Sequence, residues 1–292
     1  MTLKNLALGL LVAAALIAPC LAHADTTVVR DRFSDEIAGQ GPDLVFIPGL
    51  ASSRDTWKAV AERLKARYRV HLIQVAGFAG ESARGNAGGE VVVPTAEAID
   101  AYLVEQRLVP ATIIGHSLGG TMTLYLSERH PEHLKKAMLV DALPFFATLM
   151  MGPSATVEAV KPIAEQVRGG AEKMSDAQRD QMMRSMATAP SDLATIKGWS
   201  EASDKGVVMN ATADDMMLDL RPGLAKLTTP IVLLHPDYSP LGSPPGVSDQ
   251  MYRTAYAAAP TVKVVEIAPS LHFIMLDQPA KFDAALDAFL AQ

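Results

Sequence analysis

Beyond its first two dozen residues the chain contains no cysteine, so the rest of it can form neither a disulfide nor a thiolate. It also contains no cluster of basic residues, and its formal charge at pH 7 is −6. A negatively charged protein without a basic cluster is not expected to bind nucleic acid. The sequence shows no internal repeat, no cofactor fingerprint and no closely spaced set of metal-ligating side chains, so we predict no cofactor and no metal site.

The first 24 residues have the three parts of a secretory signal peptide. A basic start is followed by an apolar run over residues 6–21 and by the small-residue cleavage site Ala22-His23-Ala24. The run is too short, and cleavage follows too promptly, for a stable membrane span. We therefore expect a mature protein that starts near Asp25, exported to a bacterial periplasm or to the medium. The alternative is a lipoprotein acylated at Cys20, although Pro19 stands where a small residue is usual.

Strand and helix patterns alternate along most of the chain. Uninterrupted apolar runs, as at 44–47 and 231–234, are typical of strands buried on both faces. A period of 3.6 residues, as at 54–67, indicates an amphipathic helix. This alternation predicts an α/β fold with a mostly parallel sheet flanked by helices. Further strands are expected at 26–33, 70–75, 111–114, 136–141 and 262–267, and further helices at 95–106 with Thr95 as N-cap, 121–129, 248–258 and 279–290.

The pattern changes between residues 142 and 227, where only helical patterns and helix breakers occur. We expect a helical lid there, inserted into a core that is formed by residues 25–141 and 228–292. The lid helices are expected at 154–167, 175–188, 191–197 and 214–220.

Nine of the fourteen methionines lie between Met150 and Met217. Methionine is flexible and polarisable, so a surface rich in Met and Phe suits a pocket for apolar groups of varied shape. Most of these methionines, taken singly, are expected only to pack the lid against the core. The candidate substrate-binding residues are Phe145, Phe146 and Met150, together with Phe78 from the glycine-rich loop at 77–89.

A G-x-S-x-G motif runs from Gly115 to Gly119, between an expected buried strand and an expected helix. So sharp a turn strains the backbone of Ser117, and it closes only if the flanking positions lack bulky side chains. The Ser117 hydroxyl is then exposed at the carboxyl edge of the sheet. The amide of Leu118 lies beside it at a helix N-terminus, where the dipole favours a developing negative charge. Such a position suits a nucleophile.

With this motif and its context, residues 42–291 resemble the α/β-hydrolase family in its serine esterase, lipase and lactonase-like branches. The resemblance implies the α/β-hydrolase fold with an inserted lid and a Ser–His–Asp triad. It also implies that Pro48-Gly49-Leu50 forms the oxyanion loop, with the amides of Leu50 and Leu118 facing a substrate oxygen. Proline stands where that loop often has histidine, which leaves the backbone donor in place.

A serine hydroxyl needs a neighbouring base, normally a histidine held by a carboxylate. The segment Ser270-Leu271-His272-Phe273 resembles the histidine loop of the family and follows the family order of serine, acid and histidine. His272 is therefore the expected base, and His235 is the alternative. The other histidines fall in the leader, in a strand, beside Ser117 but pointing away, or on a surface turn: His23, His71, His116, His130 and His133.

Two aspartates compete for the role of the acid. The resemblance favours Asp237, just past the strand expected at 231–234, although it lies a residue or two early and the usual glycine is replaced. Asp141, at the end of the strand after the nucleophile helix, is the alternative that some branches use. The expected activity is hydrolysis of small to medium, apolar carboxylic esters through an acyl-enzyme. Hydrolysis of a lactone or of a carbon–carbon bond, and a binding protein that has lost catalysis, are the alternatives.

Overall fold

The computed structural model describes residues 26–170 and 175–292. The expected signal peptide lies outside the described residues. Within these two ranges, no helix has both the length and the apolar character that a membrane span needs.

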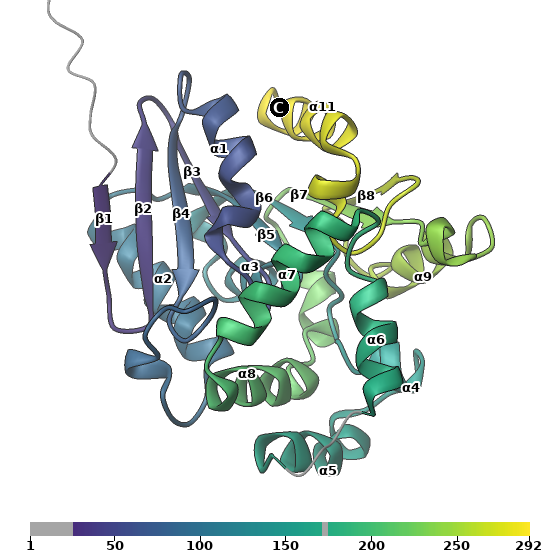
Figure 1. Cartoon of the computed structure of the whole chain (residues 1–292). Helices are drawn as coiled ribbons and strands as arrows, with labels where there is room; N and C mark the ends of the chain where they lie inside the picture. The colour runs from purple at the N-terminus through teal and green to yellow at the C-terminus, as the bar shows by residue number, and fades with distance from the viewer. Residues whose placement is uncertain (1–25, 171–174) are drawn as a thin grey trace, which may run out of the picture.

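Eight strands form a single sheet in the order β1-β2-β4-β3-β5-β6-β7-β8 (Figure 1). β1 and β2 pair in antiparallel fashion, as do β2 and β4, whereas all pairs from β4 through β8 are parallel. The six parallel strands therefore end at the same edge of the sheet, and the prediction of a mostly parallel sheet is confirmed. The strands are β1 (Thr26–Val29), β2 (Phe33–Gly39), β3 (Asp43–Ile47), β4 (Arg69–Val75), β5 (Ala111–His116), β6 (Leu134–Val140), β7 (Ile231–Pro236) and β8 (Val262–Ile267).

Helices cover both faces of the sheet (Figure 1). The core helices are α1 (Lys58–Leu64), α2 (Val92–Glu105), α3 (Leu118–Arg129), α9 (Val247–Ala255), α10 (Ile274–Asp277) and α11 (Pro279–Leu290). Within the described residues, the helices between β6 and β7 are α4 (Thr148–Met151), α5 (Val157–Arg168), α6 (Asp176–Arg184), α7 (Pro190–Ala202) and α8 (Lys205–Met217). We refer to α4–α8 as the inserted helices.

Strand β3 shows why the central strands contain uninterrupted apolar runs. Leu44 and Phe46 pack into one core with α1 and α11, while Val45 and Ile47 pack into the other core with α2, α3 and α9. Because successive side chains of a strand point to opposite faces, a strand covered on both sides has no position left for solvent. Each such side chain contributes about 1.5–3 kcal/mol through its burial.

Two expectations about helices are wrong. Helix α2 begins at Val92, so Thr95 lies inside the helix and is not its N-cap. The first turn is instead capped by Asp214 of α8, whose carboxylate accepts hydrogen bonds from the amides of Val91 (2.6 Å) and Val92 (3.2 Å). Helix α8 itself begins at Lys205, well before the helix expected at 214–220.

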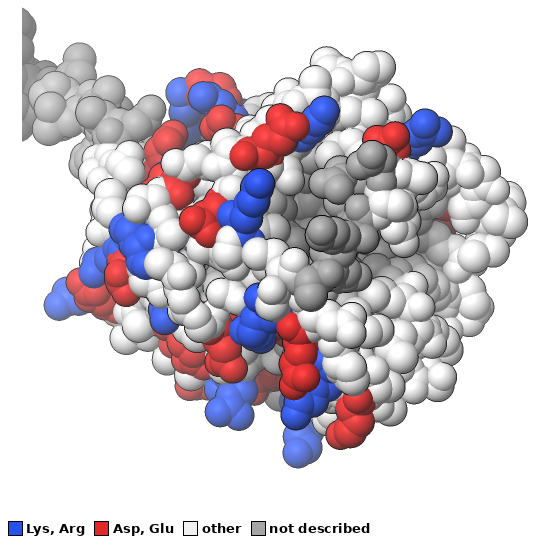
Figure 2. All heavy atoms as spheres, turned by 60° about the horizontal axis from the view of Figure 1, so that its bottom comes forward, with Lys and Arg blue, Asp and Glu red and all other residues white. Residues whose placement is uncertain are grey.

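Acidic and basic side chains are mixed on the surface. On the face shown in Figure 2, the side chains of Lys and Arg lie next to those of Asp and Glu, and no large area of one sign is seen among the described residues of that face. This face therefore offers a nucleic-acid backbone no continuous positive surface.

Candidate active site

Ser117 occupies the sharp turn between β5 and α3, with φ = 53° and ψ = −121°. The two glycines of the motif are required because there is no room for a side chain at either position. A Cβ at Gly115 would collide with the carbonyl oxygen of Gly119, and a Cβ at Gly119 would collide with that of Ile47. The sequence therefore predicted the steric reason for both glycines correctly.

Ser117 and Asp141 follow neighbouring, paired strand ends. His116 at the end of β5 is in register with Val140 at the end of β6, and the amide of Ser117 donates to the carbonyl of Val140 (2.9 Å). The residue after each strand end therefore lies at the same edge of the sheet. This register brings the serine and this aspartate to adjacent positions.

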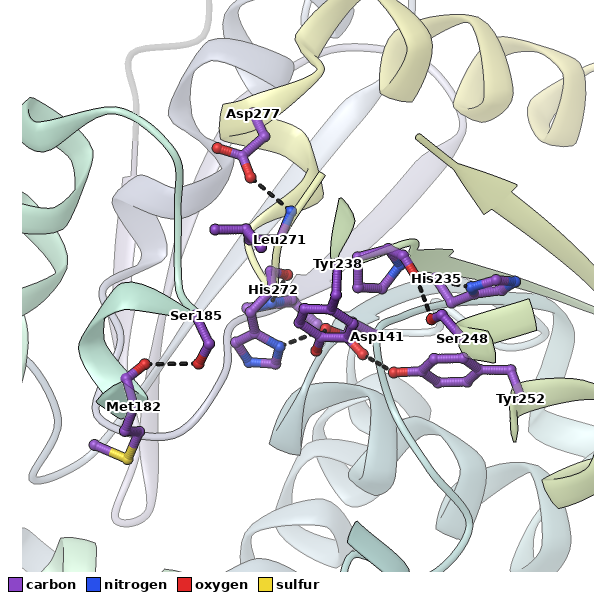
Figure 3. Close-up of polar contacts among 12 residues, drawn as sticks. Asp141, Met182, Ser185, His235, Tyr238, Ser248, Tyr252, Leu271, His272 and Asp277 are labelled. Carbon is purple, nitrogen blue, oxygen red and sulfur yellow. Dashed lines mark hydrogen bonds and ion pairs between the residues drawn. The ribbon is translucent and has the colours of Figure 1, made fainter. Parts of the chain in front are cut away.

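The side chains of His272 and Asp141 are hydrogen-bonded to each other. His272 Nδ1 lies 2.6 Å from Asp141 Oδ2 (Figure 3). The side chain of Asp141 is buried and that of His272 is 19% exposed, and no described residue is hydrogen-bonded to the other ring nitrogen, Nε2. Burial acts to raise the pKa of Asp141, but the charge and hydrogen bond of His272, aided by a hydrogen bond from Tyr252, hold it below its ordinary value.

Asp237, the acid favoured from the sequence, is in contact with a different group. Its Oδ1 accepts a hydrogen bond from the amide of Ser270 (2.9 Å), in the turn that precedes His272. The carboxylate at His272 is that of Asp141, which corrects the preference for Asp237. The physical reason is local: Asp237 lies early in the loop after β7, where its short side chain caps the backbone of the neighbouring turn.

The loop after β3 packs directly against Ser117. A Cβ added to Gly49 would lie 3.0 Å from the Cβ of Ser117 and 3.1 Å from Nδ1 of His116. No described residue is hydrogen-bonded to the amide of Leu50, the next residue in this loop. Leu118 is the first residue of α3, and the first amides of a helix lack partners within that helix. The loop after β3 and the start of α3 therefore both lie next to the serine, and the oxyanion role of the two amides stays a prediction.

His116, which the sequence placed beside Ser117 but pointing away, braces the histidine loop. Its Nε2 lies 3.0 Å from the carbonyl oxygen of His272, and the centroids of the two rings are 4.6 Å apart. Burial lowers the pKa of His116 to about 3, so its ring stays neutral. The neutral ring fixes the backbone of His272 without adding a charge to the site. The sequence contained no signal for this contact.

The inserted helices hold the histidine loop from the opposite side. The carbonyl of Ser185 accepts a hydrogen bond from the amide of His272 (3.1 Å), and that of Met186 accepts one from the amide of Phe273 (2.8 Å). These carbonyls lie between α6 and α7, and Figure 3 shows Ser185 close to His272. The orientation of His272 therefore depends on the insertion as well as on the core.

Asp277 of α10 joins the same two segments. Its Oδ2 accepts a hydrogen bond from the amide of Leu271 (2.7 Å), and its Oδ1 accepts hydrogen bonds from the amide (2.7 Å) and the hydroxyl (2.8 Å) of Thr188. A charged acceptor with three donors is a strong local constraint. Asp277 thus fixes the residue before His272 to the inserted segment.

The four expected substrate-binding residues differ in exposure. Phe78 and Phe145 are fully buried, Phe78 in the main core and Phe145 among the inserted helices, with the guanidinium of Arg221 4.5 Å from its ring centroid. Neither offers surface to a pocket, because tight packing of the core and of the insertion uses both rings, so the expectation is wrong for these two. Phe146 is half-buried and Met150 is 47% exposed.

Backbone strain gathers at the carboxyl edge of the sheet. Ser117, Asp141 and Tyr238 have positive φ angles of 53°, 51° and 54°, and they follow β5, β6 and β7. Ala51, in the loop after β3, has φ = 53°. Positive φ is uncommon for residues other than glycine, and it concentrates at functional sites, where the surrounding structure enforces it. Four of the seven described residues other than glycine with positive φ thus lie at the edge that carries the candidate site residues.

Other clusters and hollows of the described part of the chain lie elsewhere. Two groups bring three possible metal-ligating atoms within 4.8 Å of one another: Asp100, His130 and His133, and His235, Asp249 and Glu266. Two surface hollows have volumes of about 370 and 280 Å³. Neither the two groups nor the two hollows include Ser117 or His272.

Comparison with known proteins gives a consistent family. Residues 42–279 match the alpha/beta hydrolase fold family. A pimeloyl-[acyl-carrier protein] methyl ester esterase of Aeromonas hydrophila is 37% identical over 114 residues, which are 39% of this chain and 42% of that relative. The same enzyme of Edwardsiella ictaluri is 24% identical over 85% of this chain and 92% of its own length. The first relatives are therefore matched over only about two fifths to three fifths of their length.

Solved structures show the same architecture. An esterase of Exiguobacterium antarcticum has a TM-score of 0.72 at 20% identity and covers 92% of this chain and all of its own. An enol-lactonase of Burkholderia xenovorans has a TM-score of 0.71 at 17% identity, covering 89% of this chain and 96% of its own. The family match spans most of the chain and includes the serine turn and the histidine loop. This chain therefore belongs to the alpha/beta hydrolase fold family.

Proposed function

We propose that this protein is a serine hydrolase that cleaves carboxylic esters through Ser117, His272 and Asp141. The observation that carries the proposal is the 2.6 Å contact between His272 and Asp141 at the sheet edge where Ser117 occupies its strained turn. A buried carboxylate on Nδ1 fixes the histidine tautomer and leaves Nε2 to accept a proton.

The chemistry follows the roles of these groups. The Ser117 oxygen attacks the ester carbonyl while His272 Nε2 takes the serine proton. The oxyanion is stabilised by the amides of Leu50 and Leu118, each of which contributes about 3 kcal/mol. The carbon–oxygen bond to the alcohol then breaks, and the alcohol leaves with the proton from His272. Water attacks the acyl-enzyme with His272 as base, the acid is released, and the proton returns to Ser117.

We infer substrates with apolar acyl groups of small to medium size. The relatives named methyl ester esterases support an ester, and the methionine-rich insertion supports an apolar acyl group. We propose that the inserted helices act as a lid, since their segment 185–188 is bonded to the histidine loop. Met150 and the half-buried Phe146 remain candidates for substrate contact on that lid.

We further propose that the protein is exported after cleavage near Ala24. Cell fractionation and N-terminal sequencing of the recovered protein would test this. A protein that keeps its first 24 residues in the cytoplasm would contradict it.

The proposed activity is tested by turnover of a panel: p-nitrophenyl esters of graded acyl length, lactones and amides. We expect ester hydrolysis that falls by about 10⁴-fold or more in Ser117→Ala. Ser154→Ala, which changes an exposed serine of the insertion, is the matched control and should leave turnover unchanged. A preference for lactones over esters would assign the alternative scissile bond. Full turnover in Ser117→Ala, or no turnover of any member by the folded wild type, would overturn the proposal.

A further inference from the structure

Asp141 is hydrogen-bonded to two tyrosines as well as to His272. The hydroxyl of Tyr252 donates to Oδ1, and that of Tyr238 donates to Oδ2 at 3.0 Å. Figure 3 shows the carboxylate between the rings of His272 and Tyr252, with the ring of Tyr238 overlapping it in this view. One buried carboxylate thus accepts hydrogen bonds from three side chains, on three separate segments of the chain.

Tyr238 reaches this carboxylate through a strained backbone. It has φ = 54° and ψ = 17° in the loop after β7, and its amide donates to the carbonyl of Ser270 (3.1 Å). Bulky residues rarely adopt this left-handed conformation, so the surrounding contacts must enforce it. The position next to Asp237, where the sequence favours the acid, therefore supplies a donor to the acid of the neighbouring strand.

Tyr252 is held from the other side. It is buried on α9, and its ring stacks on that of His235 with centroids 4.6 Å apart and planes 17° apart. Ser248, one turn earlier on α9, donates to the carbonyl of Pro236 and so fixes the helix to the end of β7. Burial, followed by the charge of Asp141, raises the pKa of both phenols, so both keep their protons and act as donors.

We propose that Tyr238 and Tyr252 are positioning residues that spread the negative charge of Asp141 and thereby set the pH at which His272 becomes a base. The inference rests on the proposed function for its catalytic meaning. The Asp141 carboxylate holds the ring proton of His272 through their hydrogen bond, and it attracts that proton less strongly when other donors share its charge. Removal of a hydroxyl donor leaves that charge less stabilised, so the pair should keep its proton to a higher pH.

Several other titratable groups lie around the pair. His116 faces His272 and stays neutral, Asp237 and Asp277 accept from the backbone of the histidine loop, and His235 stacks on Tyr252. Burial raises the pKa of two further carboxyls to about 7: Asp215 beside Thr121 of α3 and Glu128 near Tyr256. The pH dependence of turnover could reflect the ionisation of any of these groups. The test therefore requires a signal from His272 itself.

The experiment follows the ring proton of His272 by NMR titration in the full protein, with His272→Gln used for assignment. The variants are Tyr238→Phe, Tyr252→Phe and the double variant. Tyr256→Phe is the matched control, because Tyr256 is a buried tyrosine directly after α9 whose hydroxyl donates to the carbonyl of Ala142 (3.0 Å) and not to the Asp141 carboxylate. We expect the midpoint to rise by about half a pH unit in each single variant and by more in the double variant. In the pH profile of kcat/KM, the pH at which activity rises should also move to a higher value.

The outcomes separate this inference from the proposed function. A His272 midpoint unchanged in Tyr238→Phe and Tyr252→Phe would overturn the inference, even if the enzyme hydrolyses esters. An equal shift in Tyr256→Phe would also overturn it, because the effect would then be general. A shifted midpoint in a protein that hydrolyses no ester would contradict the proposed function and leave the tyrosine effect standing. If Tyr252→Phe does not fold, the half-buried Tyr238 still provides the test.

Discussion

Two histidine–aspartate pairs in this molecule use similar contacts in different places. At the carboxyl edge of the sheet, His272 binds Asp141 at 2.6 Å, with two tyrosine hydroxyls on the carboxylate. Within the sheet, His71 of β4 binds Asp35 of β2 at 2.7 Å, and Tyr102 donates to the same carboxylate. Both pairs thus combine a short histidine–aspartate hydrogen bond with a tyrosine hydroxyl that donates to the carboxylate.

The pairs differ in what happens at the second ring nitrogen. His71 Nε2 lies 3.0 Å from Asp43, so both of its nitrogens face carboxylates in a buried setting. Burial acts to lower the pKa of His71, but the hydrogen bonds to Asp35 and Asp43 outweigh it and raise the pKa. His272 binds a carboxylate on one side only and is partly exposed on the other. A histidine–aspartate contact thus offers a candidate base only where Nε2 has no carboxylate partner, as at His272 and unlike His71.

The strongest test of this comparison substitutes each of the two histidines in turn and measures both activity and stability. We expect His272→Gln to lower turnover by about 10⁴-fold or more while the melting temperature stays close to that of the wild type. His71→Gln should leave the turnover of the folded protein unchanged and lower the free energy of unfolding by about 3–5 kcal/mol, because it removes the histidine partner of the buried Asp35 carboxylate, while Asp43 keeps its ion pair with Arg69. Ester turnover and urea unfolding measured on both variants provide the check. Activity lost equally in the two variants would refute the distinction.

The two candidate acids form a second, matched pair of variants. Asp141→Asn should reduce kcat by about 10⁴-fold, because the amide stabilises the wrong tautomer of His272 and cannot stabilise its imidazolium. Asp237→Asn keeps an oxygen acceptor for the Ser270 amide and should change kcat by no more than a few-fold. Steady-state kinetics of the two variants decide between them. The reverse ranking would reinstate Asp237 as the acid.

A substitution of Gly49, at the same carboxyl edge of the sheet, should have a smaller effect on activity. In Gly49→Ala the new methyl group would press on the Cβ of Ser117, and neither that atom nor the ring of His116 can move freely. We expect kcat/KM to fall several-fold, since these contacts of 3.0 and 3.1 Å require smaller shifts than the displacement of about 1 Å that costs about 100-fold. Gly88→Ala, at a position with open space around it, serves as the control. Unchanged turnover in Gly49→Ala would place the loop away from the reacting atoms.

The smallest predicted effect is the pH dependence of stability that His71 causes. Because its folded-state pKa is raised, the stabilisation is fully present below the unfolded value of about 6.5. It is lost as the pH rises through the folded value, so the free energy of unfolding should fall on the alkaline side. Urea unfolding of the wild type and of His71→Gln at a series of pH values measures this. A wild-type curve parallel to that of the variant would exclude the effect.

The features that followed from the sequence are those set by local patterns. The apolar runs placed the central parallel strands because these strands are covered on both faces, and Gly115 and Gly119 placed the serine turn because no larger residue fits there. The final helix, Pro279–Leu290, has the bounds that its periodicity predicts.

The features that did not follow are contacts between distant segments. Asp214 caps α2 from the insertion, so Thr95 was assigned a capping role that a residue more than one hundred positions away fulfils. Asp141 rather than Asp237 reaches His272 because the relative reach of two loops depends on their folded geometry. The burial of Phe78 likewise depends on how completely the neighbouring elements cover it.

The most direct test of the central claim is covalent labelling of the wild type by a fluorophosphonate, followed by peptide mass mapping. We predict one adduct on Ser117, absent in Ser117→Ala and formed far more slowly in His272→Gln and Asp141→Asn. A folded wild-type protein that forms no adduct, or an adduct on a different serine, would contradict the account.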